Sequence, residues 1–258
     1  MKKQRVVVKI GTNILTHPDG SPHLDRLHQL VEQICTVITP IRDVLLVSSG
    51  AISCGLYAFK NSPQRICEKQ AAAAVGQTRL MTQYKDCFAK HDCHVAQLLV
   101  TKDGLSHKTH KKNILNTITT LWDNHIFPII NENDSVSTDE IGSQFGDNDS
   151  LSAYIAHLIG ADFLVILTDT DGLLSHHPSH PDAQLIEQVD VITDDTFKLC
   201  KDQKNHRSKG GMLAKLHAAN FATQNGVDTV IANGETNNVL HDILNGFSRG
   251  TLFHGKRS

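Results

Sequence analysis

Residues 126–134 read Ile-Phe-Pro-Ile-Ile-Asn-Glu-Asn-Asp, an apolar run followed directly by a cluster of amides and carboxylates. The apolar run has the length of a buried strand. In open α/β sheets, ligands bind beyond the carboxyl ends of the strands, which is where this polar cluster would lie. A second cluster, Gly-Asp-Asn-Asp at 146–149, opens a helical pattern and would face the same crevice. A turn and a helix cap would use the same residue types, so the two clusters alone do not establish a site.

Short apolar runs alternate with helical patterns along the chain. The predicted strands are 6–10, 44–47, 95–100, 126–130, 163–167 and 227–232. The predicted helices are 24–38, 69–89, 114–122, 151–159 and 212–224. This alternation indicates an α/β fold with a mostly parallel central sheet and helices on both faces. Gly-Thr-Leu-Phe at 250–253 predicts a final edge strand, and no linker divides the chain, so we expect a single domain over 1–258.

Composition excludes several classes of partner. The 258 residues are 40% hydrophobic and carry a formal charge of -2 with a pI near 6.7, so we expect neither nucleic acid nor an anionic membrane as a partner. No apolar run approaches the length of a membrane span, and the N-terminus runs straight into a predicted strand without a signal peptide. Six cysteines without C-x-x-C spacing fit reduced thiols, so we expect a cytoplasmic protein.

Four glycine-bearing loops follow strands or open helices, at 9–13, 48–51, 168–172 and 209–215. Glycines allow backbone N–H groups to approach an anion closely, although any strand-to-helix turn can need one. No loop has the Walker A pattern, and no G-x-G-x-x-G is present. Lys9 ends an otherwise apolar strand, two residues before Gly11, and either reaches solvent as a snorkelling edge lysine or contacts a phosphate. We favour the phosphate contact.

Several motifs resemble those of one known family. They are Val-Val-Lys-Ile-Gly-Thr-Asn (7–13), Val-Ser-Ser-Gly-Ala-Ile (47–52), Lys-Gln-Ala-Ala-Ala-Ala-Val-Gly-Gln (69–77), Asn-Glu-Asn-Asp (131–134), Gly-Asp-Asn-Asp (146–149), Leu-Thr-Asp-x-Asp-Gly-Leu (167–173), Gly-Gly-Met-x-x-Lys (210–215) and Gly-Thr-Leu-Phe (250–253). In this order they resemble the glutamate 5-kinases of the amino acid kinase superfamily. The resemblance implies a three-layer sandwich and ATP-dependent phosphorylation of the γ-carboxylate of L-glutamate to L-glutamate 5-phosphate, the first step of proline biosynthesis.

The resemblance also implies roles for individual residues. Lys9 and Lys215 would bracket the transferred phosphoryl group as catalytic residues, with Asp149 holding both ammonium groups, and Gly11 and Gly50 would bring backbone N–H groups to the phosphates. The implied glutamate-binding residues, mainly in the N-terminal part, are Ser49, Gly50, Asp134, Asp147 and Asn148. The implied nucleotide-binding residues, mainly in the C-terminal part, are Lys9, Gly11, Thr168, Asp169, Lys209, Gly210, Gly211, Met212, Leu213, Ala214 and Lys215. Mg²⁺ would be bound mainly through the ATP phosphates, without a named protein ligand.

Three departures from the family pattern are present. Lys209 replaces a frequent Thr, Leu213-Ala214 replaces a Ser-Thr pair, and Gln144 stands at an often basic position. The resemblance further implies a homo-oligomer, proline as a feedback inhibitor, functional coupling to glutamate-5-phosphate reductase, and a short form that lacks the C-terminal PUA domain. Two alternatives stay open: another acyl-phosphate-forming kinase, similar to acetylglutamate or carbamate kinase, and a non-catalytic amino-acid or nucleotide sensor.

Overall fold

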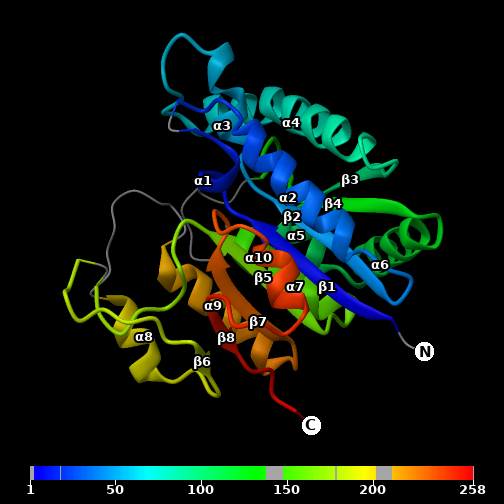
Figure 1. Ribbon diagram of the computed structural model, residues 1–258. Helices are drawn as coiled ribbons and strands as arrows, with labels where there is room; N and C mark the ends of the chain where they lie inside the picture. Colours follow the sequence, from blue (N-terminus) through cyan, green and yellow to red (C-terminus); the bar gives the residue numbers. More distant parts are fainter. Residues whose placement is uncertain (1–2, 18, 138–147, 178, 202–210, 258) are drawn as a thin grey trace.

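The computed structural model describes residues 3–17, 19–137, 148–177, 179–201 and 211–257 (Figure 1). Eight strands form one sheet in the order β3-β4-β2-β1-β5-β7-β8-β6. The strands are β1 (Gln4–Ile10), β2 (Arg42–Ser48), β3 (His94–Val100), β4 (Ile126–Glu132), β5 (Phe163–Thr168), β6 (Gln188–Val189), β7 (Asp228–Asn233) and β8 (Thr251–Phe253). All neighbours pair in parallel except β7 and β8, which confirms the predicted mostly parallel sheet.

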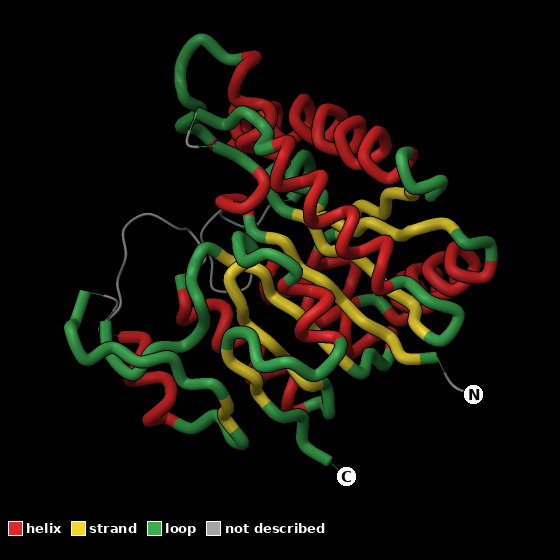
Figure 2. Tube along the Cα trace, in the orientation of Figure 1, coloured by secondary structure: helices red, strands yellow, loops and turns green. Residues whose placement is uncertain are grey.

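Helices cover both faces of the sheet, as Figure 2 shows, and the three-layer arrangement is confirmed. On one face lie α1 (Thr12–Leu15), α2 (Leu24–Val37), α3 (Ala51–Gly55), α4 (Ile66–Ala89) and α10 (Val239–Leu244), with the 3-10 turn η1 (Leu56–Ala58) following α3. On the other face lie α5 (Lys102–Ser106), α6 (Lys108–Asp123), α7 (Asn148–Ile159), α8 (Asp194–Lys201) and α9 (Met212–Gln224). Within the described residues, no helix has the length and apolar character needed to cross a bilayer.

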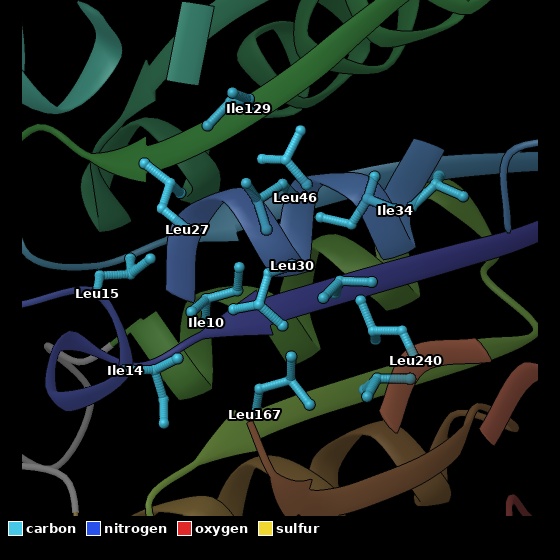
Figure 3. Packing of buried hydrophobic residues seen from close by; sticks show 14 of the residues in the cluster. Ile10, Ile14, Leu15, Leu27, Leu30, Ile34, Leu46, Ile129, Leu167 and Leu240 are labelled. Atoms are coloured by element: carbon cyan, nitrogen blue, oxygen red, sulfur yellow. The ribbon is translucent and has the colours of Figure 1, made fainter. Parts of the chain in front are cut away.

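Two apolar cores result because successive strand residues point to opposite faces. In β1, Val6, Val8 and Ile10 join the core beneath α2, where Leu27, Leu30 and Ile34 supply the apolar stripe expected of an amphipathic helix (Figure 3). Val7 joins the opposite core, and Lys9 has the same parity. The alternation therefore directs the Lys9 side chain toward the face covered by α7 and α9.

The end of the chain differs from the expected edge strand. The structure places β8 between β7 and β6, so β8 is internal and the two-residue strand β6 forms the border of the sheet. The prediction was wrong because a strand of two residues gives no alternating pattern that could be recognised in the sequence.

Helices α3 and α4 meet through two glycines. A Cβ built on Gly55 would lie 1.9 Å from the carbonyl oxygen of Ala72, and a Cβ built on Gly76 would lie 1.8 Å from that of Ala51. No side chain fits between backbones this close, so glycine is required at both positions. This contact holds the start of α4 against the loop that follows β2, next to the carboxyl end of the sheet.

Candidate active site

A buried carboxylate lies between two lysine side chains. Asp149 stands in the first turn of α7, and its Oδ2 accepts a hydrogen bond from Nζ of Lys215 at 3.0 Å. Its Oδ1 contacts Nζ of Lys9. Lys9 is 5% exposed, Asp149 1% and Lys215 6%, so the whole triad of Lys9, Asp149 and Lys215 is shielded from water. Lys9 is therefore not a snorkelling edge lysine, since β1 lies in the middle of the sheet.

The charges of the triad do not cancel. Burial would raise the pKa of Asp149, but attraction to Lys9 and Lys215 and their hydrogen bonds outweigh it and lower the pKa below its ordinary value of 3.8. The Asp149 carboxylate thus faces two ammonium groups, the Asp169 carboxylate also attracts Lys215, and the N-termini of α7 and α9 add partial positive charge. This point of the molecule is electrostatically prepared for an anion.

A network of amides and a hydroxyl lies beside the triad, at the carboxyl ends of β2 and β4. Nδ2 of Asn148 lies 3.0 Å from Oγ of Ser49, 3.1 Å from the carbonyl oxygen of Ser48 and 3.0 Å from Oδ1 of Asn131. Nδ2 of Asn131 donates in turn to Oε1 of Gln77 on α4 at 2.8 Å. The structure therefore brings Ser49 and Asn148, two of the residues expected to bind glutamate, into direct contact, and Asn131 links Asn148 to Gln77.

Asp134 lines a hollow that it shares with Gln77, the α4 residue of this amide network. This hollow of about 630 Å³ lies between α4, β3 and the turn after β4, and Glu132 also borders it. Burial, and secondarily the nearby Glu132 carboxylate, raise the pKa of Asp134 to about 6. In the described part of the chain Asp134 makes no hydrogen bond to Ser49 or Asn148, and Gln77 is the residue common to the hollow and the network.

The loop after β1 and the end of β5 are tied together. Gly11 N–H donates to the carbonyl oxygen of Leu167 at 3.1 Å, so this N–H is engaged within the fold rather than presented to a phosphate as expected. A Cβ on Gly11 would lie 3.3 Å from the carbonyl oxygen of Leu167, a tight contact, and 3.7 Å from Nζ of Lys9, an ordinary one. Asp169 accepts hydrogen bonds from Nδ2 of Asn13 at 2.8 Å and from Oγ1 of Thr168 at 3.1 Å.

The other predicted residues that the structure describes lie partly beside β2, on the side expected to bind glutamate, and partly at the start of α9, on the side expected to bind the nucleotide. Gly50 adopts a φ of +98°, a conformation that favours glycine, and starts α3. Gly211 caps α9, so Met212, Leu213 and Ala214 form its first turn and lead to Lys215. Asp147, Lys209, Gly210 and the unusual Gln144 lie outside the described residues.

Three further residues join the site in the structure: Gln77, Asn131 and Asn13. All three fall inside the recognised motifs, but residue type and motif membership do not show which member of a motif contacts which. Asn131 is 1% exposed although it is an amide, and this burial, visible only in the fold, identifies it as part of a polar network. Among the described residues, no group of three or more His, Cys, Asp or Glu side chains is arranged to hold a metal ion.

Comparison with known proteins identifies the family. Residues 4–233 match the model of the amino acid kinase family. A relative named glutamate 5-kinase from Clostridium perfringens is 43% identical over 98% of this chain and 96% of its own length, and one from Lactiplantibacillus plantarum is 40% identical over 98% and 97%. The solved structure of carbamate kinase from Giardia lamblia bound to AMP-PNP shares the fold, with a TM-score of 0.67 and 18% identity over 98% of both chains. The chain therefore belongs to the amino acid kinase family and, within it, to the glutamate 5-kinases.

Proposed function

We propose that this chain transfers the γ-phosphoryl group of ATP to the γ-carboxylate of L-glutamate, giving L-glutamate 5-phosphate and ADP. The observation that carries the proposal is the buried triad of Lys9, Asp149 and Lys215, which places two ammonium groups side by side at the carboxyl ends of the parallel strands. The relatives named glutamate 5-kinase support the choice of acceptor.

The reaction asks for charge neutralisation rather than proton transfer. A γ-carboxylate oxygen of glutamate forms a bond to the γ-phosphorus while the bond from that phosphorus to the β,γ-bridging oxygen breaks, and ADP leaves with the electron pair. The carboxylate is already ionised at neutral pH, so no general base is needed. Catalysis then depends on aligning two anions and on stabilising the negative charge of the phosphoryl oxygens. The ammonium groups of Lys9 and Lys215, held in place by Asp149, would provide this stabilisation.

The two sides of the site divide the ligands between them. Ser49, Gly50, Asp134, Asp147 and Asn148 are proposed to hold glutamate, with Asp134 facing its ammonium group. Thr168, Asp169 and residues 209–215 are proposed to hold ATP beside Lys9, and Gly11 is proposed to line the same site without donating its N–H, which Leu167 engages. Mg²⁺ carried on the ATP phosphates is part of the same proposal and would offset phosphate charge.

The instability of the acyl phosphate product implies a second enzyme that consumes it. An acyl phosphate hydrolyses readily, so it has to be consumed promptly, and we propose coupling to a glutamate-5-phosphate reductase in the cytoplasm at the start of proline synthesis. Proline as a feedback inhibitor and assembly into a homo-oligomer are parts of the same proposal. Light scattering of the purified chain tests the oligomer, and a proline titration against glutamate tests the inhibition.

Trapping with hydroxylamine tests the proposed reaction. The purified chain is incubated with ATP, Mg²⁺, hydroxylamine and either L-glutamate, N-acetylglutamate or no acceptor, because hydroxylamine converts acyl phosphates into coloured hydroxamates. We expect hydroxamate with L-glutamate alone. Product only with N-acetylglutamate would keep the fold and change the substrate, and binding of ATP without any product would favour a sensor.

Replacement of Asp134 tests the amine-binding side. We expect Asp134→Asn to raise the glutamate KM by about tenfold or more at pH 7, because a hydrogen bond between charged groups is worth about 1.5–3 kcal/mol, while the ATP KM stays within about twofold. In the wild type the glutamate KM should rise as the pH falls through about 6, where Asp134 becomes protonated, and this rise should vanish in the variant.

The same substitution is expected to stabilise the fold. Because the pKa of Asp134 in the folded chain is raised above its ordinary 3.8, the wild type loses stability as the pH rises from about 4 to above about 6, and asparagine avoids this loss. Asp123→Asn, an exposed carboxylate near the opposite end of β4, is the matched control and should change neither quantity. A proportional loss of affinity for ATP and glutamate in Asp134→Asn would contradict the role.

A further inference from the structure

The orientation of the Asn148 side chain is fixed by backbone groups at both ends of the amide network. At one end, Glu132 N–H donates to Oδ1 of Asn131 at 2.9 Å, so that atom must be the oxygen and the Asn131 atom facing Gln77 must be the nitrogen. At the other end, the carbonyl oxygen of Ser48 faces Asn148 at 3.1 Å and accepts only from a donor. The Asn148 atom between Ser48 and Asn131 is therefore Nδ2 and cannot be exchanged with Oδ1 without placing oxygen against oxygen.

This orientation leaves one acceptor of Asn148 unused. Oδ1 of Asn148 is buried and has no hydrogen-bond partner among the described residues, whereas its Nδ2 has three neighbouring acceptors. A buried polar atom without a partner is costly, and in native structures such an atom commonly awaits water, an ion or a ligand. Only a donor can satisfy it. Of the groups on glutamate at neutral pH, the ammonium is the donor, and both carboxylates are acceptors.

We propose that Gln77 is a positioning residue which, through Asn131, holds the Asn148 amide in the place from which its oxygen is presented to the substrate ammonium. The hydrogen bond from Asn131 to Oε1 of Gln77 is the contact that ties the Asn131 amide to α4. Without this acceptor, the Asn131 amide is held by Glu132 N–H and Asn148 alone, so Oδ1 of Asn131, and with it the Asn148 amide, is held less firmly in position, although Ser48 and Ser49 still select Nδ2 on their side. This inference rests on the proposed function and assigns a role to Gln77 that extends it.

Two substitutions of Gln77 separate this role from a packing role. Gln77→Met keeps the length of the side chain and removes the acceptor, whereas Gln77→Glu keeps an acceptor oxygen. For Gln77→Met we expect the glutamate KM to rise about fivefold to tenfold, the effect of losing a net hydrogen bond, with kcat and the ATP KM changed by less than about twofold. For Gln77→Glu we expect a glutamate KM no more than about twice that of the wild type.

An analogue of glutamate that lacks the amine tests whether the effect of Gln77→Met depends on the substrate ammonium. Glutarate has both carboxylates of glutamate but no ammonium, and its inhibition constant against glutamate is measured for the wild type and Gln77→Met. We expect the two inhibition constants to agree within about twofold, because the hydrogen bond at stake is made to the ammonium only. Equal weakening of glutarate and glutamate would overturn the inference, as would an unchanged glutamate KM in Gln77→Met or the same KM in the Met and Glu variants.

A matched substitution controls for stability. Gln33 on α2, which covers the same face of the sheet as α4, accepts a hydrogen bond from Leu240 N–H at 3.0 Å. Gln33→Met therefore also removes a buried amide acceptor. It should lower the unfolding temperature while leaving the glutamate KM unchanged. A wild-type chain that forms no hydroxamate from glutamate would overturn the proposed function and this inference with it, whereas an active wild type with an indifferent Gln77→Met overturns the inference alone.

Discussion

Replacing Lys215 with methionine is expected to lower kcat by about 10²–10³-fold, the loss seen when one preorganised electrostatic contact to a transition state is removed. Methionine keeps the apolar stem of the buried side chain and removes the ammonium group. Lys9 and Asp149 then still form a pair, so the fold retains its central contact. The KM values should change much less than kcat, because the charge on the phosphoryl oxygens and the bridging oxygen develops in the transition state.

Steady-state kinetics with saturating ATP and glutamate measure this effect. Lys198→Met is the matched control, since Lys198 is an exposed lysine on α8 that pairs with Asp195 at 2.7 Å, and its kcat should equal that of the wild type. A kcat for Lys215→Met within about threefold of the wild type would remove Lys215 from the chemistry, because even a single hydrogen bond to a charged group is worth more than that.

Replacing Asp149 with asparagine is expected to damage both stability and activity. Asparagine has the same shape but removes the carboxylate that lies between the two buried ammonium groups, and removing one partner of a buried ion pair costs about 3–5 kcal/mol. The free energy of unfolding in urea should fall by about that amount at pH 7. The kcat should also fall, because Lys9 and Lys215 lose the carboxylate that holds them in place.

The pH dependence identifies the carboxylate as the cause. The pKa of Asp149 in the folded chain is lowered below 3.8, so its contribution is complete above about 4 and is lost as the pH falls through the folded-state pKa. The stability difference between wild type and Asp149→Asn should therefore be constant near neutral pH and shrink in acid. Asp123→Asn, which replaces an exposed carboxylate at the end of α6, should show no such difference. An Asp149→Asn chain as stable as the wild type would show that the triad is not a buried ion pair in solution.

The sheet and its long helices were predictable because burial imposes a period on the sequence. The all-apolar run Val6–Ile10, interrupted only by Lys9, and the 3.6-residue stripe of α2 leave little choice of structure. Short elements escaped prediction for the same reason: α1, α3, α5 and α10 have six residues or fewer, less than two turns, and show no period. Their positions are set by tertiary contacts, such as Gly55 against α4.

The sequence predicted which residues belong to the site better than it predicted which of them contact one another. The resemblance placed Lys9, Asp149 and Lys215 in one group, and the structure brings their charged atoms into contact across segments more than 60 residues apart. Their roles in catalysis stay predictions until the kinetics are measured. Sequence could not show that Gly11 N–H is used by Leu167, or that Gln77 reaches Asn131, because both depend on how a loop and a helix approach the sheet.

The close crossing of α3 and α4 restricts the movement of the backbone at Gln77. At Gly55 and Gly76 the two backbones touch with no compressible side chain between them, and Gln77 is the next residue along α4. The backbone of Gln77 is therefore placed by a direct contact between two backbones. Most side chains are instead placed by packing against other side chains, which can readjust. One added methyl group at Gly76 would force apart the backbones of α3 and α4, and with them the loop after β2 and the helix that carries Gln77.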